Sequence, residues 1–447
     1  MILERLRRPV STVLGRPLSG FERLMLELGP SMGCDMIVLK IQGRVDTPRL
    51  KAAGKALAAR HPMLRSRVIP GPPIRFEVGF APEIEVTEHS GDWQTAVETE
   101  LARSFDFRKS PLVRLGWCRE MDGSRVWIAA HHAVVDGTAL YLLARDLLRA
   151  LAGELPSGSM PLPESSLKTP KIPPVGVRLA QKVWGSQVRS HIQDPVVPPQ
   201  RPLLPGEPVA SNAVFGHSAP GLAETLRKTA REKGATLGGL WCAATRLAMA
   251  GWARRSARDP LHPLEVAVQV NLRGRSQGPG KEDVAFFTGG LGVSVPLDPH
   301  TPFWDLARGY SEGMKKKLDS RFPQLIFAVT DGLDSMSALS GRRGVNLLKS
   351  AGTTKLLDAS NVGPWPYSPS FGEYTLTEVY GMCGASIGGA AAIYWLRSLN
   401  GTLFWNAVGS SPYLERPELE CQLSDISRFI HGVAESPDAR VEQLLGI

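Results

Sequence analysis

A pair of histidines followed by an aspartate and a glycine is the stretch of this sequence best suited to chemistry. Residues 131–137 read HHAVVDG, so His131 and His132 lie just before Asp136 and Gly137. A neutral imidazole titrates near physiological pH and can take a proton from an attacking hydroxyl or amine. With 9 His and 45 Gly in 447 residues, and Asp assumed at about one residue in twenty, chance would produce these four positions in roughly one such chain per thousand. The motif therefore predicts a general base.

The same residues allow less specific interpretations. Two adjacent histidines on a strand can be ordinary core or surface side chains, and Asp136, just before Thr138, can be a helix cap. A metal site with His132 and Asp136 as ligands lacks an obvious third ligand nearby. We therefore expect no bound metal.

A second candidate nucleophile is Ser386, in the GASIG stretch that matches the GxSxG elbow of serine hydrolases. Asp425 and His431 supply nominal partners in the order that those enzymes use. An elbow should follow a strand and open a long helix, whereas residues 389–392 lead into a strand-like segment. We expect small residues packed in a strand or turn here, and a serine hydrolase acting through Ser386 is the alternative.

The HHAVVDG stretch must be positioned by the elements on either side of it. Residues 125–132 have the pattern of a buried strand, and residues 138–153 have that of an amphipathic helix. A strand end holds a side chain rigidly, while the loop after it leaves space for a substrate. Earlier in the chain, residues 34–43 predict a strand, and the next helix begins with Thr47 as N-cap and Pro48 at its first position.

The length of 447 residues predicts two lobes of roughly 150–220 residues each. We assign residues 1–152 to an N-terminal lobe that carries HHAVVDG and residues 211–447 to a C-terminal lobe. Residues 153–210 hold two proline-rich stretches around a helical segment at 175–193, and this composition predicts a crossover linker.

The second lobe alternates helical and strand-like segments, which makes the chain mixed α/β. Two aromatic-rich segments flank Asn400–Gly401, which is a hairpin signal. The predicted helices cover 220–233, 236–254 and 303–318, and the predicted strands cover 264–270, 291–295 and 356–361.

The composition excludes several classes of function. The net charge of +9 favours anionic partners, but the basic clusters lack interleaved aromatic residues, so we expect no nucleic acid. No apolar run reaches the ~18 residues of a transmembrane helix. The N-terminus lacks the apolar stretch of a secretory signal, so we expect a cytoplasmic protein. The five scattered cysteines predict neither a disulfide framework nor a zinc site.

The HHAVVDG stretch matches the HHxxxDG motif, and the sequence resembles the chloramphenicol-acetyltransferase-like superfamily of acyl-thioester-dependent acyltransferases. That superfamily includes condensation domains, polyketide-associated acyltransferases and wax ester synthases. The DFGWG motif of the plant branch is absent, and Phe287–Gly290 replaces the Gly-Asn of wax synthases. Other similar stretches are Arg60–Arg65, Phe105–Phe107 with Pro111–Arg114, Asn271–Arg273, and Ser360–Gly363.

The resemblance implies a fold and a set of roles. Each lobe would be a chloramphenicol-acetyltransferase-like unit, a mixed sheet with helices, and the two would form a pseudo-dimer around a central tunnel. His132 would be the general base midway along that tunnel. The residues that orient the site would be His131, Asp136, Gly137 and Arg65, with Arg65 pairing with Asp136.

The C-terminal lobe would add oxyanion or tunnel residues, for which Ser360, Asn361 and Arg273 are the candidates. Backbone amides near Gly137 are a further candidate for the oxyanion site.

The resemblance also implies the partners. The donor would be acyl-CoA, which we favour, or an acyl-phosphopantetheine carrier protein, and the acceptor would be a small alcohol or an amine. No permanently bound cofactor is required, and we expect a monomer acting in specialised-metabolite or lipid biosynthesis. One alternative is a stand-alone condensation-type enzyme that forms amides on carrier-protein substrates. Another is a non-catalytic docking protein that kept the fold.

Overall fold

The computed structural model of the chain describes residues 14–27, 33–79, 83–164, 211–331, 356–384, 390–411 and 414–446, together with Pro173 and Gly176. Three sequence predictions lie outside the described residues: the helix over 175–193, most of the linker over 153–210, and the environment of Ser386.

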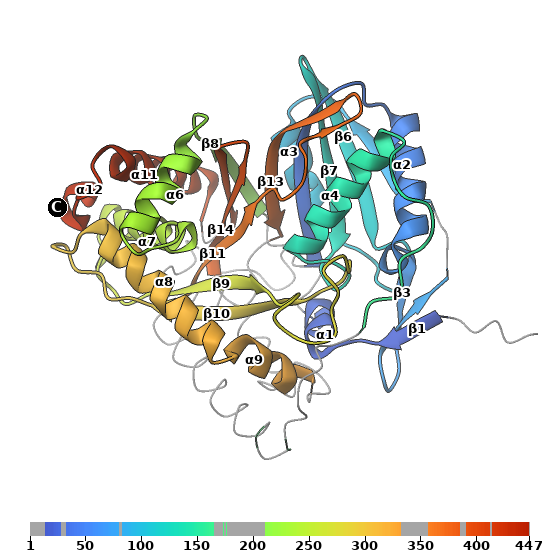
Figure 1. Cartoon of the computed structure of the whole chain (residues 1–447), viewed down its shortest axis with the longest axis horizontal. Helices are drawn as coiled ribbons and strands as arrows, with labels where there is room; N and C mark the ends of the chain where they lie inside the picture. The colour runs from blue at the N-terminus through green and yellow to red at the C-terminus, as the bar shows by residue number, and fades with distance from the viewer. Residues whose placement is uncertain are drawn as a thin grey trace, which may run out of the picture.

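The first lobe is built on a six-stranded sheet in the order β12-β13-β2-β7-β6-β5 (Figure 1). Its central strands are nearly continuous apolar runs, which is typical of strands covered on both faces. Helices α2 and α4 contact each other over this sheet (Figure 1). The elements are β2 (Cys34–Gln42), α2 (Thr47–Arg60), β5 (Glu85–His89), α3 (Trp93–Ala102), β6 (Val113–Glu120), β7 (Gly123–His131), α4 (Gly137–Leu151), β12 (Ser370–Phe371) and β13 (Tyr374–Cys383).

The start of α2 differs by one residue from the sequence prediction. The helix is capped by Asp46, whose carboxylate accepts a hydrogen bond from the Arg49 amide at 2.9 Å. The predicted cap, Thr47, is wrong, because its hydroxyl is engaged elsewhere: it donates to Glu88 and accepts from the indole nitrogen of Trp117.

A small three-stranded sheet in the order β1-β4-β3 lies at the edge of the first lobe. It consists of β1 (Leu14–Pro17), β3 (Ser66–Ile69) and β4 (Arg75–Val78), and it is accompanied by α1 (Gly20–Glu27) and a single 3-10 turn, η2 (Pro62–Arg65).

The second lobe is built on another six-stranded sheet, in the order β10-β9-β11-β14-β15-β8. Strand β11 runs parallel to β9 and β14, while the other neighbours are antiparallel. The elements are β8 (Ser211–His217), α6 (Leu222–Glu232), α7 (Leu237–Arg255), β9 (Glu265–Asn271), β10 (Thr288–Ser294), α8 (Phe303–Asp319), α9 (Phe322–Asp331), β11 (Leu356–Pro364), β14 (Ala390–Leu399), β15 (Thr402–Ser410), α11 (Arg416–Glu435) and α12 (Val441–Leu445).

The hairpin between β14 and β15 confirms a turn that two residues predicted. Asn400 and Gly401 have φ angles of 46° and 77°. Two consecutive positive φ angles are the requirement of the tight turn that matches strand twist in a two-residue hairpin.

One segment crosses from the second lobe to the first. Residues 370–383 fall within the range assigned from the sequence to the second lobe, but β13 pairs antiparallel with β2 and so extends the first sheet (Figure 1). The inner edge of β2 would otherwise present unpaired backbone groups between the lobes. The chain thus forms two mixed α/β lobes, as predicted. Strands β12 and β13, which come from the second part of the sequence, belong to the sheet of the first lobe. None of the described helices combines the length and apolarity needed to span a bilayer.

Candidate active site

The HHxxxDG motif occupies the tight connection between β7 and α4. The backbone amide of His132 donates to the carbonyl of Gly33 at 2.6 Å, and that of Val134 donates to the carbonyl of His131 at 2.9 Å. These bonds fix the main chain at the end of a buried strand. The imidazole of His132 is therefore held by a rigid backbone, as the sequence predicted from the strand end.

The ring of His132 is oriented by two acceptors on one of its nitrogens. Its Nδ1 lies 2.9 Å from the carbonyl oxygen of Val135 and 3.4 Å from Oδ2 of Asp35. A carbonyl oxygen can only accept, so Nδ1 carries the hydrogen, and the lone pair of the neutral ring is on Nε2. The ring meets Phe286 of the second lobe edge-on, with centroids 5.2 Å apart. This geometry suits a base that takes a proton through Nε2.

His131 has a different environment from its neighbour. It is buried, and its Nδ1 accepts a hydrogen bond from the amide of Ala133 at 3.1 Å. Burial, with a smaller contribution from His132, lowers the pKa of His131 to about 4, so the ring is neutral at physiological pH. A Cβ added to Gly33 would stand 3.0 Å from its Nε2. The side chain of His131 therefore packs and bonds within the connection between β7 and α4, which is a structural role.

Asp136 joins the two lobes. It is fully buried, and it caps α4 by accepting from the amide of Ala139 at 2.8 Å. Its two oxygens also accept from Nη1 of Arg273 at 3.0 and 2.7 Å, and from the amide of Phe287 at 2.7 Å. Helix capping and interlobe pairing are therefore combined in one carboxylate.

Arg273 uses the rest of its guanidinium on the second lobe. Its Nε and Nη2 donate to the carbonyl of Asp283 at 3.1 and 3.0 Å, and its Nη2 donates to the carbonyl of Ala285 at 2.7 Å. The cation also lies 5.0 Å from the ring centroid of Phe287. The motif loop is thus clamped to the 273–287 segment by one arginine.

The predicted pairing of Arg65 with Asp136 is wrong. Nη2 of Arg65 instead donates to the hydroxyl of Ser159 at 3.3 Å. The physical reason is that the carboxylate of Asp136 already accepts from Arg273 and from two backbone amides, so its lone pairs are occupied. Arg60 and His61 bond to Asp146 on α4. Arg60 and Arg65 bond to Pro156 and Ser159, so this element is attached to the first lobe and to the residues that follow it.

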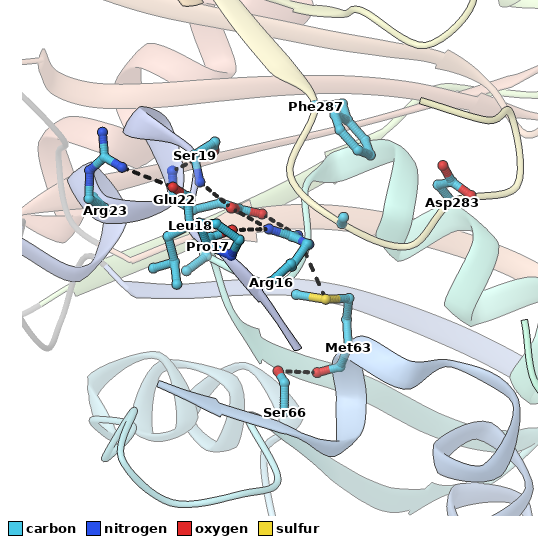
Figure 2. Close-up of polar contacts among 12 residues, drawn as sticks. Arg16, Pro17, Leu18, Ser19, Glu22, Arg23, Met63, Ser66, Asp283 and Phe287 are labelled. Atoms are coloured by element: carbon cyan, nitrogen blue, oxygen red, sulfur yellow. Dashed lines mark hydrogen bonds and ion pairs between the residues drawn. The ribbon is translucent and has the colours of Figure 1, made fainter. Parts of the chain in front are cut away.

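The neighbours of Arg65 attach to the N-terminal segment. Met63 contacts Nη2 of Arg16 through its sulfur at 3.7 Å, and the hydroxyl of Ser66 donates to the carbonyl of Met63 at 2.6 Å (Figure 2). Arg16 itself forms a bidentate pair with the buried carboxylate of Glu22, at 2.8 and 2.7 Å (Figure 2). This cluster joins the small sheet to α1.

Asp35 is a site residue that the sequence analysis missed. It lies on β2, opposite Ala130 of β7 and Cys383 of β13, and is 6% exposed. Burial raises the pKa of Asp35 to about 6, while the charges of His132 and Arg397 act in the opposite direction. The available signal was an acidic residue within the apolar run CDMIVLKIQ, since carboxylates are seldom fully buried without a partner.

The strand that carries Ser360 and Asn361 approaches the start of α4. A Cβ added to Gly137 would meet Cγ2 of Val362 at 3.4 Å, and the hydroxyl of Tyr141 donates to the carbonyl of Gly363 at 3.2 Å. The side chain of Ser360 is 5% exposed, and that of Asn361 accepts from the amide of Gly363 at 2.9 Å. The structure therefore brings this element of the second lobe against the motif helix.

The partners proposed for Ser386 are engaged otherwise. Asp425 pairs with Arg255 at 2.8 Å and with Arg428 at 3.0 Å. Nδ1 of His431 lies 2.8 Å from the carbonyl of Ser427, one helical turn earlier. In the described part of the chain, no three His, Cys, Asp or Glu side chains are grouped to hold a metal ion.

Sequence comparisons point to one family. The family model described as Condensation domain matches residues 29–317. The nonribosomal peptide synthetase ecdA of Aspergillus rugulosus is 31% identical over 109 residues, which are 24% of this chain and 2% of that protein. Surfactin synthase subunit 1 of Bacillus subtilis is 24% identical over 204 residues, which are 44% of this chain and 6% of that protein. The chain thus spans a small part of the curated relatives that it matches first.

Solved structures share the fold. The TRI3 trichothecene 15-O-acetyltransferase of Fusarium sporotrichioides superposes with a TM-score of 0.70 at 12% identity, covering 93% of this chain and 95% of that one. A mutant starter condensation domain of rhizomide synthetase, in complex with C8-CoA and Leu-SNAC, superposes with a TM-score of 0.63 at 14% identity, covering 96% of both chains. Since the family model matches most of the sequence and the fold agrees over nearly all of it, the chain belongs to the condensation-domain family.

Proposed function

We propose that this protein is an acyltransferase that moves an acyl group from an acyl thioester to an alcohol or an amine, with His132 as general base. The observation that carries the proposal is the orientation of His132. Val135 accepts the Nδ1 hydrogen at 2.9 Å, which leaves the Nε2 lone pair for a substrate proton. The ring lies where Phe286 and Arg273 of the second lobe meet the motif loop.

The proposed reaction needs no acyl-enzyme. The oxygen or nitrogen of the acceptor attacks the thioester carbonyl while Nε2 of His132 accepts its proton. The tetrahedral intermediate then expels the thiolate. The thiolate accepts from Nε2 the proton that the acceptor had given up. Asp35, whose Oδ2 lies 3.4 Å from Nδ1, stabilises the imidazolium formed in between. Hydrogen-bond donors near Gly137, or the hydroxyl of Ser360, would stabilise the oxyanion.

The donor that we favour is acyl-CoA, and the acceptor that we favour is an alcohol. The net charge of +9 suits a phosphorylated donor. A structural neighbour was solved with C8-CoA, and another is an O-acetyltransferase. The synthetase relatives favour the alternative, an amide-forming condensation on carrier-protein substrates. In either case we propose that donor and acceptor enter a tunnel between the lobes from opposite ends.

The direct test is a product screen. The protein would be incubated with acyl-CoA thioesters of increasing chain length and with pooled alcohols and amines, and the products would be identified by mass spectrometry. We expect an ester or amide product that is absent when His132 is replaced by alanine. If neither acyl-CoA nor a loaded carrier protein gave any product, the proposal would fail and a docking role would be favoured.

Substitution of Asp35 should weaken catalysis without abolishing it. In Asp35→Asn, the imidazolium loses its neighbouring charge, but Val135 still fixes the tautomer. We expect kcat to fall by about tenfold to a hundredfold at neutral pH, or roughly 1.4–2.7 kcal/mol of transition-state stabilisation. Steady-state release of CoA measures this change.

The pH dependence of that effect is a second readout. The Asp35 carboxyl becomes charged as the pH rises through its pKa of about 6. The ratio of wild-type to Asp35→Asn activity should therefore be largest above about pH 7 and should shrink below pH 6. A ratio that is the same at every pH would show that the charge of Asp35 plays no part.

Intact-protein mass spectrometry separates this mechanism from that of a serine hydrolase. With acyl-CoA and no acceptor, we expect no covalent acyl adduct and no burst of thiol release, because His132 acts as a base and not as a nucleophile. Ser386→Ala should change the kinetics little. An added acyl mass that disappears in Ser386→Ala would make the protein a serine hydrolase or a ping-pong enzyme.

A further inference from the structure

Two buried polar side chains of the second sheet lack hydrogen-bond partners. Arg397 on β14 is 2% exposed, and its Nε and Nη1 have no partner among the described residues. Asn406 on β15 is fully buried, and neither its Oδ1 nor its Nδ2 has a partner within the same part of the chain. Buried polar groups are normally paired, because leaving one unsatisfied is costly. Two such groups close together are candidates for hydrogen bonds to a polar group of a ligand.

The two side chains share one face of the sheet. In the β14–β15 register, Arg397 is opposite Phe404 and Trp395 is opposite Asn406, so Arg397 and Asn406 are diagonal neighbours. Diagonal neighbours on one face are about 7–8 Å apart, within reach of an arginine side chain. Trp395 and Phe404 belong to the hydrophobic cluster of the first lobe. The face that carries Arg397 and Asn406 therefore looks toward the first lobe.

The guanidinium of Arg397 reaches the first lobe at a glycine. A Cβ on Gly381 of β13 would overlap Nη2 of Arg397, so this approach depends on the absence of a side chain there. The cation also lies 4.6 Å from the ring centroid of Tyr141 on α4. Gly381 is two residues from Cys383, the partner of Asp35 in the sheet, so the cation lies over the face that carries Asp35.

The electrostatics agree with this placement. The charge of Arg397 is one of the influences that lower the pKa of Asp35 against the effect of burial. Asp35 in turn lies 3.4 Å from His132. Among the described residues, no carboxylate forms an ion pair with Arg397 within 4.0 Å. Arg397 therefore lies on the same side of the sheet as the carboxylate that adjoins the base, and no carboxylate of the described residues is paired with it.

Other buried arginines of this chain show what a structural role looks like. Arg246 lacks a partner at its Nε, but it donates through both terminal nitrogens to the carbonyls of Pro260 and His262. Arg273 uses its nitrogens on Asp136 and on backbone carbonyls. Arg397 is buried to a similar degree, yet both its Nε and its terminal Nη1 lack a hydrogen-bond partner among the described residues.

We infer that Arg397 and Asn406 bind a carboxylate carried by one of the two substrates. The inference rests on the proposed acyl transfer and names its substrate class: an acidic acceptor, such as an amino or hydroxy acid, or the half-thioester of a dicarboxylic acid. The unpartnered Nη1 of Arg397 can donate a charge-assisted hydrogen bond to a carboxylate, and the side-chain amide of Asn406 adds a second donor. The phosphates of CoA are separated from its thioester by the pantetheine arm, so they are not the anion expected beside the base.

A binding experiment tests the inference without relying on turnover. His132→Ala protein, which should not turn substrate over, would be titrated calorimetrically in two arms. The first arm compares leucine and 3-hydroxybutyrate with their methyl esters. The second compares succinyl-CoA with butyryl-CoA. We expect one arm to show at least a tenfold preference for the free carboxylate, and that arm identifies the substrate that carries it.

Variants then assign the preference to these side chains. Adding Arg397→Met should remove it, Arg397→Lys should retain part of it because the charge stays while the position of the donor changes, and Asn406→Leu should weaken it. The matched control is Arg246→Met, which removes an equally buried arginine on the far side of the sheet and should leave the preference intact. Equal binding of acid and neutral probes in both arms, or a preference that survives Arg397→Met, would overturn the inference. Because His132→Ala is used throughout, either result is independent of whether acyl transfer occurs.

Discussion

His132→Ala should reduce kcat by about 10²–10⁴-fold, the loss expected when a general base is removed. The free energy of unfolding should change little. His132 is 14% exposed at its side chain and bonds through Nδ1 to one backbone carbonyl, so its removal leaves few stranded groups. Steady-state assays of CoA release measure kcat, and denaturant titration measures the free energy of unfolding.

The neighbouring histidine provides the matched control. His131→Ala removes the same side chain one residue earlier, but the ring of His131 is buried and accepts from the amide of Ala133. We expect its loss to lower stability more than His132→Ala does and to lower kcat of the folded fraction less. If His132→Ala kept near-wild-type turnover, or if both variants lost turnover equally while folded, His132 would not be the base.

The parts of the fold that the sequence predicted are those set by local pattern. The strand before HHxxxDG, the helix after it and the hairpin at Asn400–Gly401 each follow from periodicity or turn chemistry within a few residues. The pairing of β13 with β2 joins residues more than 300 positions apart, for example Cys383 and Asp35, and no local pattern encodes such a partner.

The same distinction applies to the site. His132 and Asp136 are neighbours in sequence, so one motif contained both. The partner of Asp136 is decided by which arginine reaches it across the lobe interface, and Arg65 and Arg273 both ended motif-like stretches. Asp35 and Arg397 lie in mainly apolar strands. A single charged residue in such a strand has no local partner in the sequence, so its role depends on which residues the fold places opposite it. Charged residues buried between lobes were therefore the least predictable part.

Removing either partner of the ion pair between Asp136 and Arg273 should be the most destabilising single substitution near the motif. Both side chains are buried, and their closest oxygen and nitrogen are 2.7 Å apart. Removing one partner of a buried pair strands the other charge, which typically costs about 3–5 kcal/mol. We therefore expect that much loss of unfolding free energy for Asp136→Ala or Arg273→Met, with activity falling because the loop that carries His132 loses its clamp. Denaturant titration of each variant measures the loss.

Arg65 supplies the matched control for this prediction, since it is the arginine that the resemblance paired with Asp136. Its Nη2 bonds to the hydroxyl of Ser159, so Arg65→Met should cost about 0.5–1.5 kcal/mol, the value of an ordinary hydrogen bond. The double variant Asp136→Ala/Arg273→Met should be less destabilised than the sum of its single variants, because neither charge is left alone. Asp136→Ala/Arg65→Met should instead be additive. Coupling of Asp136 to Arg65 and not to Arg273 would show that the interlobe clamp is assigned to the wrong arginine.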